Sequence, residues 1–304
     1  MKRIYFDNAA STPLEKEVVE RMSEVMMTIY GNPSSIHQGG RIARTLVEEA
    51  RKIVADSINA SIGEIFFTSC GTESNNMILK GAVNDLDVKR IISTKIEHHC
   101  ILNTLDRIDM THDDVEIFYL NVNHFGEPDL EKLEELLSLS NVKTLVSLMH
   151  CNNELGTMIS LKRVREICKK YDALFHSDTV QTIGQYDIDV ANTNIHFLAA
   201  SSHKFYGPKG VGFVYISNDV TLNPFIDGGA QERNMRGGTE NIYGIAGLSK
   251  ALELAISQQK SRRESVLSIK EYMKKSLTEK IDGLSFNGNP ESSSAKVLSV
   301  NFLI

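Results

Sequence analysis

The chain has 304 residues, of which 41% are hydrophobic and 24% charged, with a formal net charge of −6 at pH 7. Such a composition is typical of a globular protein with a sizeable core, in one large domain or two smaller ones. The basic residues are dispersed and no apolar run reaches the ~18–20 residues of a membrane helix, so we expect neither nucleic-acid nor membrane partners.

Short β-rich runs alternate with helical patterns along most of the chain. The expected strands cover residues 65–67, 90–93, 115–119, 144–149, 173–176, 195–199 and 211–216, and the helices between them cover 72–83, 100–108, 130–137 and 161–170. An amphipathic helix is expected over 40–58 and a long helical stretch over 243–280. A loop rich in Gly, Asn, Pro and Ser (282–294) then leads to an expected strand at 296–303.

This alternation predicts an α/β fold, a mostly parallel sheet with helices on both faces. In such sheets a ligand binds beyond the carboxyl ends of the strands. The N-terminal residues lack the apolar stretch of a signal peptide, so we expect a cytoplasmic location.

The four cysteines show no C-x-x-C spacing, so no zinc or other metal site is expected. They are Cys70, Cys100, Cys151 and Cys168. For most of them, the simplest interpretation is a small buried thiol.

Lys204 lies in the run Ser-Ser-His-Lys-Phe-Tyr-Gly-Pro-Lys-Gly (201–210), which follows an expected strand. A desolvated lysine can act as a Schiff-base nucleophile, although most lysines are solvated surface residues. Asp178 ends another expected strand. It could hold a cofactor ring nitrogen protonated, or simply cap a helix.

The run 68–75 (Thr-Ser-Cys-Gly-Thr-Glu-Ser-Asn) is a strand–turn–helix junction. With Gly71 at the turn, the first helical amides could bind a phosphate, or Ser69 or Thr72 could merely cap the helix. His98 and Asn153 follow strand ends, where a stacking ring or an amide would be useful, but a loop histidine and a turn asparagine are equally ordinary. The Gly-containing loop 233–241 could hold an anion or only connect two elements.

The order of these motifs resembles that of the cysteine desulfurases, in the class V aminotransferase group of fold-type I enzymes that use pyridoxal 5'-phosphate (PLP). The resemblance runs from Tyr-Phe-Asp-Asn-Ala-Ala-Ser-Thr-Pro (5–13) through Gly-Asn-Pro-Ser-Ser (31–35) to the last expected strand. Its most specific parts are Ser-x-His-Lys with Tyr-Gly-Pro-Lys-Gly, and Arg-x-Gly-Thr-Glu-Asn. It implies a seven-stranded-type sheet in a large PLP-binding domain (15–255). Residues 1–14 and 256–304 would form a smaller, incomplete α+β domain.

The resemblance also implies roles for individual residues. Lys204 would form the Schiff base and act in catalysis with His98, which would stack on the ring. Asp178 would pair with the ring nitrogen, with Gln181 and Asn153 near the ring oxygen. The remaining residues would hold phosphate: Gly71, Thr72, Ser201 and His203 in the same subunit, and Thr239 in the neighbouring subunit of a homodimer.

The implied reaction converts L-cysteine to L-alanine and leaves the sulfur as a persulfide on a cysteine of the enzyme. The sulfur would then pass to an acceptor protein, such as an iron–sulfur cluster scaffold, or enter a thiolation pathway. In the family the nucleophilic cysteine and the arginine that binds the substrate carboxylate follow the strand that matches 296–303. None of the four cysteines aligns with that nucleophile. The sequence therefore predicts a truncated protein that binds PLP but desulfurates cysteine poorly or not at all.

Three other interpretations stay open at this point. The chain could be another class V PLP enzyme, such as a selenocysteine lyase or an aminotransferase. It could also be a catalytically impaired PLP-binding protein that acts as a partner in cluster assembly. The third is an α/β protein without PLP, which would require several PLP-type motifs to coincide by chance.

Overall fold

The computed structural model of the chain describes residues 4–302. One sheet has the strand order β1-β7-β6-β5-β4-β2-β3, and β7 alone is antiparallel to its neighbours. This confirms the predicted mostly parallel α/β fold. Its strands are β1 (Ile65–Thr68), β2 (Arg90–Thr94), β3 (Glu116–Leu120), β4 (Thr144–Ser147), β5 (Leu174–Asp178), β6 (Phe197–Ser201) and β7 (Gly212–Ile216).

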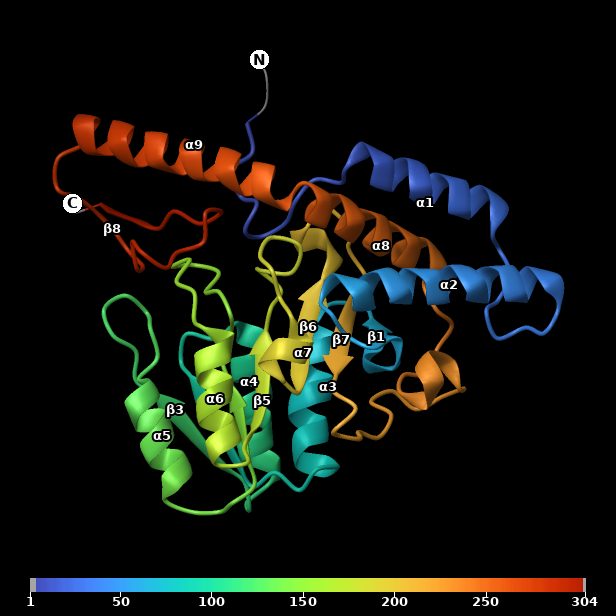
Figure 1. The fold of residues 1–304 in the computed structure, drawn as a ribbon, viewed down its shortest axis with the longest axis horizontal. Helices are drawn as coiled ribbons and strands as arrows, with labels where there is room; N and C mark the ends of the chain where they lie inside the picture. The colour runs from blue at the N-terminus through green and yellow to red at the C-terminus, as the bar shows by residue number, and fades with distance from the viewer. Residues whose placement is uncertain (1–3, 303–304) are drawn as a thin grey trace.

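Helices cover both faces of this sheet (Figure 1). One face packs against α3 (Gly71–Asn84) and α4 (His99–Thr111). The opposite face packs against α2 (Gln38–Ser57), α5 (Leu130–Ser138), α6 (Leu161–Lys170) and α8 (Ile242–Ser257).

Neighbouring residues of a strand belong to different cores, because side chains alternate between the two faces of a sheet. Phe66 packs with α3 and α4, whereas Ile65 and Phe67 pack with the core on the other face. Both faces are buried, so the strands read as continuous apolar runs in the sequence.

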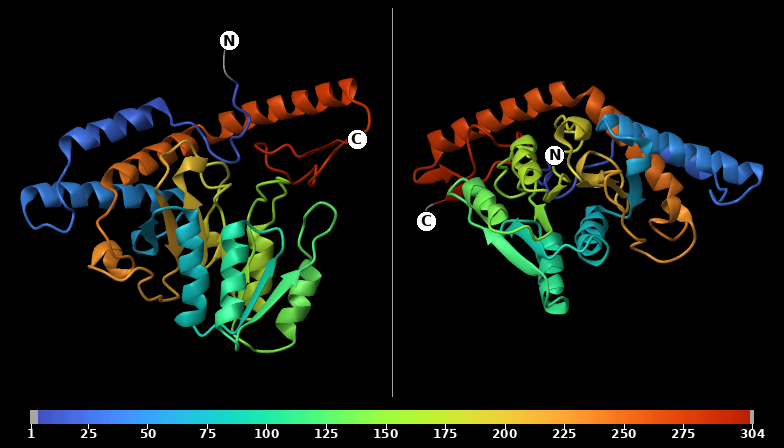
Figure 2. Two further views of the ribbon diagram at one scale, coloured as in Figure 1. Left: turned by 180° about the vertical axis from the view of Figure 1, so that it is seen from behind. Right: turned by 60° about the horizontal axis from the view of Figure 1, so that its bottom comes forward.

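The remaining elements lie at the ends of the chain and around the sheet. They are α1 (Lys16–Thr28), α7 (Val190–Thr193), α9 (Gln259–Lys280), β8 (Leu284–Phe286) and β9 (Val300–Phe302). The small β8–β9 sheet and the α1–α2 pair lie at opposite ends of the molecule (Figure 2). Among residues 4–302, no helix is both long and apolar enough to cross a bilayer.

The C-terminal part differs from the sequence prediction. β9 begins at Val300, not at residue 296, because the preceding residues have other partners: Lys296 donates to the Lys204 carbonyl and Val297 packs against Gly156. β8 lies inside the expected loop 282–294, where it gains backbone bonds from β9. The expected strand end at Leu303 lies outside the described residues.

The long helical stretch is broken at Gln258, and α9, unlike α8, buries no side chain among the described residues. The break falls near the predicted domain boundary at 255/256. The division into a large domain (15–255) and a small one (1–14 and 256–304) stays a prediction.

Candidate active site

A cavity of about 410 Å³ lies at the carboxyl ends of the central strands. Nine of the ten predicted site residues line it, while Thr239 lies elsewhere, in an exposed loop. The nine are Gly71, Thr72, His98, Asn153, Asp178, Gln181, Ser201, His203 and Lys204. Their common location is an observation; their individual roles stay predictions.

Lys204 follows β6 in a short 3-10 turn, and its ammonium group donates a hydrogen bond to the carbonyl of Ala9. Desolvation lowers the pKa of Lys204, although the negative charges of Asp178, Asp7 and Glu154 oppose the shift. A lowered pKa increases the fraction of neutral amine, which is the nucleophilic form.

An N-terminal segment covers the turn that carries Lys204. The amide and the hydroxyl of Thr12 both donate to the His203 carbonyl at 2.9 Å, and the Thr12 hydroxyl accepts from the Tyr206 amide at 2.7 Å. Gln181 donates to the Ala9 carbonyl at 3.0 Å. The sequence motifs assigned no site role to this segment, because its contacts join residues nearly two hundred positions apart.

Asp178 ends β5, and both of its carboxylate oxygens accept hydrogen bonds. The Val180 amide donates to one at 2.9 Å and the Asn75 side-chain amide to the other at 2.7 Å. Burial raises the pKa of Asp178, while these two bonds and the nearby Lys204 charge lower it. The Val180 bond forms a turn, so the helix-cap interpretation is wrong: in the described part of the chain, the next helix after Asp178 is α7, which begins only at Val190.

A chain of buried side chains fixes Asn75 in turn. Its oxygen lies 3.1 Å from His176 Nε2, and His176 Nδ1 lies 2.9 Å from the Ser147 hydroxyl. Because the Asn75 amide donates to Asp178, its oxygen must accept, which assigns the His176 proton to Nε2. Burial lowers the pKa of His176 to about 3, so the ring is neutral. Sequence reasoning missed His176 and left Asn75 without a role.

Gly71 borders the cavity, but its own position has no room for a side chain. A Cβ on Gly71 would lie 2.5 Å from Val180 Cγ2. Neither Ser69 nor Thr72 caps α3, which corrects the capping interpretation: the N-cap is Cys70, whose side chain makes no capping bond within the described residues, and Glu73 accepts from the Ser69 amide at 2.9 Å. The first-turn amides of α3 are therefore free to bind an anion.

His98 caps α4 and accepts a hydrogen bond from the Cys100 amide at 3.2 Å. Asn152 is buried and forms the turn that follows β4, and the half-buried Asn153 lines the cavity. Glu97, the residue before His98, is buried, and sequence reasoning missed it. It accepts from the Met149 amide at 2.8 Å, and burial raises its pKa to about 8, with the charge of Asp178 adding to the shift.

Two thiols, Cys70 and Cys100, line the cavity. Burial, with the nearby Asp178 charge, raises the pKa of Cys100 to about 12. Burial also raises the pKa of Cys151 to about 11 and that of Cys168 to about 12. A thiol that stays protonated is a poor nucleophile, so none of these three has the character of a sulfur-accepting cysteine.

Comparisons with known proteins agree with this geometry. Residues 4–303 match the family described as Aminotransferase class-V. The chain is 43% identical over 291 residues to a protein named cysteine desulfurase IscS from Dictyoglomus turgidum, which covers 95% of this chain and 73% of that protein. It is 41% identical to a Bacillus subtilis protein named putative cysteine desulfurase IscS 1, with 99% of this chain and 79% of that protein covered.

Solved structures show the same likeness. A structure titled NifS-like protein has a TM-score of 0.94 and 37% identity, and the match covers 99% of this chain and 82% of that one. Another, titled SspA in complex with cysteine, has a TM-score of 0.88 and 33% identity, with 99% and 84% covered.

Proposed function

Since the chain belongs to the cysteine desulfurases of the class V aminotransferase family, we propose that its cavity binds PLP and L-cysteine and that Lys204 holds the cofactor covalently. The observation that carries this proposal is the arrangement of one cavity: the amine of Lys204 and the carboxylate of Asp178 both face it.

The cavity fits PLP because its walls hold buried polar atoms that could bond a polar ligand. Gln181 Oε1 and Ser201 Oγ are buried without a hydrogen-bond partner among residues 4–302, and both residues line the cavity. A buried polar atom without a partner is costly, and a bound polar ligand would remove that cost. A phosphate near Ser201 would also meet the first amides of α3 at Gly71 and Thr72.

PLP, when bound, acts as an electron sink for the substrate. Asp178, kept in place by Asn75, would hold the ring nitrogen protonated. Gln181 and Asn153 would contact the ring oxygen, His98 would stack on the ring, and His203 would help to hold the phosphate. Lys204, once free, is the base that would move a proton at the substrate carbon.

The substrate sulfur would leave carbon for a thiolate. The carbon–sulfur bond breaks, the sulfur forms a persulfide with the accepting thiol, and the remaining carbon skeleton takes up a proton and leaves as L-alanine. We assign the accepting role to none of the four cysteines. From the persulfide, sulfur would pass to an acceptor protein such as a cluster scaffold, or to a thiolation pathway.

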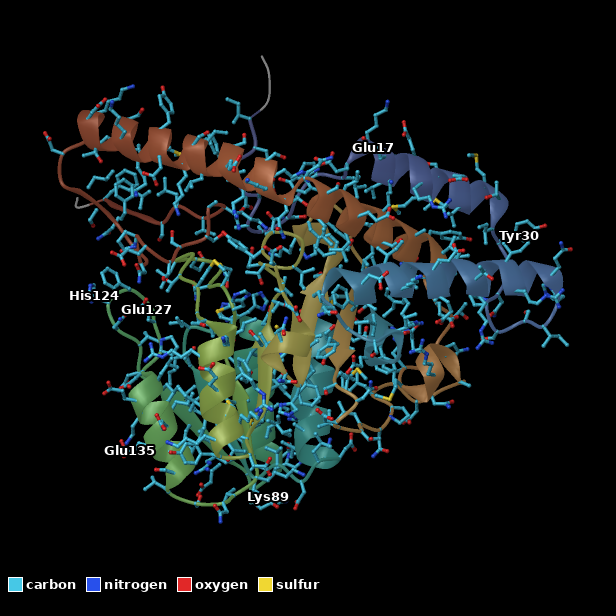
Figure 3. The ribbon with its side chains drawn as sticks, viewed as in Figure 1. Glu17, Tyr30, Lys89, His124, Glu127 and Glu135 are labelled. Carbon is cyan, nitrogen blue, oxygen red and sulfur yellow. The ribbon has the colours of Figure 1, made fainter. Side chains whose placement is uncertain are left out.

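Two copies of the chain would share their sites. Thr239 lies outside its own cavity and is exposed, as a residue that serves a neighbouring subunit must be. Large apolar side chains are also exposed around the end of α1, where Met27, Tyr30 and Ile36 are 76%, 86% and 91% accessible (Figure 3 labels Tyr30). Such a patch favours a protein partner, here a second copy. The cytoplasmic location stays a prediction.

Reduction with borohydride tests the cofactor proposal, because it converts a Schiff base into a stable secondary amine. We expect one reduced PLP per chain, mapped to Lys204, and none in Lys204→Ala. The matched control Lys209→Ala, which removes an exposed lysine of the same loop, should keep the adduct. Absence of an adduct in the unmodified chain after PLP is added would refute the proposal.

The amino-acid product tests the reaction. With L-cysteine and excess dithiothreitol, we expect alanine and sulfide at a low rate, both dependent on Lys204, because none of the four cysteines is assigned the sulfur-accepting role. Return of the cofactor as its pyridoxamine form would instead identify an aminotransferase, and turnover of selenocysteine alone a selenocysteine lyase. PLP bound without any turnover would identify a PLP-binding partner protein.

A further inference from the structure

The loop between β7 and α8 has an unusual backbone just before Thr239. Three consecutive residues other than glycine are left-handed: Glu232 (φ 44°), Arg233 (φ 57°) and Asn234 (φ 66°). Residues with a Cβ avoid this region, and a run of three persists only where the surroundings impose it. Such strain is found mainly at functional sites.

A buried ion pair imposes this conformation. The Glu232 carboxylate, 3% exposed, receives both terminal nitrogens of Arg51 at 2.6 and 2.9 Å, and it also accepts from the Phe67 amide at 2.7 Å. Arg51, 2% exposed, donates further to the Ile65 carbonyl at 2.8 Å. The loop is thereby fixed to α2 and to β1, one of the two edge strands of the described sheet.

Further contacts hold the segment between Glu232 and Thr239. Arg233 donates to the Ile62 carbonyl at 2.8 Å and to Glu48 at 3.0 Å. The backbone at Gly237 touches Gly228 so closely that a Cβ on Gly237 would lie 2.7 Å from Gly228 Cα. On the far side of Thr239, Asn241 caps α8 by accepting from Gly244.

Thr239 therefore lies between fixed points while its own side chain is exposed. A loop that only connects a strand to a helix needs neither a left-handed run nor a buried ion pair, whose desolvation is costly. Because these contacts hold the loop on both sides of Thr239, we infer that the function of the loop is to place the Thr239 side chain.

We propose that Glu232 is a positioning residue, which holds Thr239 outward for the cofactor phosphate of a second copy of the chain. This inference rests on the proposed function, that is, on PLP and on a homodimer. It adds that Glu232 acts across the dimer, on the site of the other subunit, although it is buried in its own.

Mixed dimers separate action across the dimer from a local structural effect. A Lys204→Ala chain, which cannot form the borohydride adduct, is co-expressed with a Glu232→Gln chain under a different tag. In the mixed dimer, the site that contains Lys204 is completed by the unaltered loop of the Lys204→Ala chain. The fraction of Glu232→Gln chains with a reduced PLP is then measured by mass at increasing PLP concentration.

Alone, the Glu232→Gln protein should need about tenfold more PLP for half-labelling, which corresponds to one lost hydrogen bond to a charged group. In the mixed dimer the requirement should return to that of the unmodified protein. Equal labelling of the Glu232→Gln protein and the unmodified protein, or no recovery in the mixed dimer, would overturn the proposal.

Removal of one member of a buried pair can prevent folding, so Arg233→Ala is tested in the same way. This substitution removes the bonds of Arg233 to Ile62 and Glu48, which hold the same loop. It should raise the PLP concentration needed for labelling by less than Glu232→Gln does, and the mixed dimer should restore it in the same way. Arg107→Ala, on the exposed face of α4, is the control and should change nothing.

Thr239→Ala in the same scheme distinguishes failure of the inference from failure of its premise. If Thr239→Ala recovers in mixed dimers and neither Glu232→Gln nor Arg233→Ala does, the inference alone is wrong. If Thr239→Ala does not recover, although Lys204 of the unmodified protein is labelled, the shared site is wrong and the inference falls with it. An unlabelled Lys204 would refute the PLP proposal itself.

Discussion

Glu97 shows how a single buried group links the cofactor site to the stability of the protein. Glu97 is 6% exposed and lies next to His98 in the sequence. The Met149 amide and the Thr94 hydroxyl donate to it, at 2.8 and 3.4 Å. Its other oxygen has no partner among the described residues, so ionisation would leave a charge poorly compensated.

We predict that Glu97 makes the protein less stable as pH rises. Its pKa is raised to about 8 in the folded chain, against about 4.3 in an unfolded one. Between these values the folded state holds a proton that the unfolded state has lost. Stability therefore decreases through this window, by at most ~1.4 kcal/mol per pH unit.

Glu97→Gln removes this titration and keeps the acceptor for Met149. The free energy of unfolding of the variant, measured by urea denaturation, should rise relative to the unmodified protein between pH 5 and pH 8. The control Glu17→Gln, on the outer side of α1 (Figure 3), should change the free energy of unfolding by the same amount at every pH in this range. If the stability difference between Glu97→Gln and the unmodified protein also stays constant, the Glu97 carboxyl of the folded protein is already ionised at pH 5.

At the scale of elements, the start of α3 shows how one helix is adapted to a ligand. Its N-cap Cys70 makes no side-chain capping bond within the described residues, and Glu73 in its first turn accepts from the Ser69 amide and pairs with Arg236 at 3.0 Å. Asn75, one turn on, reaches Asp178. The first two turns of α3 thus contact the Asp178 carboxylate and the loop before α8 that carries Thr239, and they begin at Gly71, where we propose that the phosphate binds.

Gly71→Ala should weaken cofactor binding as well as destabilise the fold. The new Cβ would meet Val180 Cγ2 at 2.5 Å, which must move α3 away from the turn after Asp178. We expect a loss of ~1–3 kcal/mol in stability and at least a tenfold weaker affinity for PLP, measured by absorbance titration. Gly63→Ala is a matched control, since its Cβ would meet nothing closer than 3.8 Å. Unchanged PLP affinity in Gly71→Ala would contradict a phosphate site at this turn.

At the scale of the whole molecule, both ends of the chain converge on the turn that carries Lys204. Thr12 binds the His203 carbonyl and the Tyr206 amide, and Lys296 donates to the Lys204 carbonyl at 3.0 Å. Tyr206 itself is left-handed, with φ 67°, a conformation that needs such support.

Thr12→Val should release the N-terminal segment from the site. The substitution preserves shape but leaves the Tyr206 amide without its acceptor, at a cost of ~1–3 kcal/mol. Hydrogen exchange should accelerate over residues 7–12 and 203–206 together, although they are far apart in sequence. Thr111→Val, which removes an exposed hydroxyl on α4, should not change exchange there. Acceleration in only one of the two segments would show that they are not coupled.

The sequence by itself determined the alternation of strands and helices in the main sheet and the motifs that follow the strand ends, although several strand ends lie one or two residues from their predicted positions. Those features depend on local patterns: apolar runs, turn residues such as Gly71, and the run around Lys204. Nine of the ten residues selected in this way meet at one cavity. The tertiary structure alone decided the Asn75–His176–Ser147 chain behind Asp178, the cover of Thr12 and Ala9, and the Arg51–Glu232 pair. Each of these joins residues 29 or more positions apart, and no periodicity or turn signal records a pairing of that kind. They exist because folding buries polar groups that must then find partners wherever the chain brings them together.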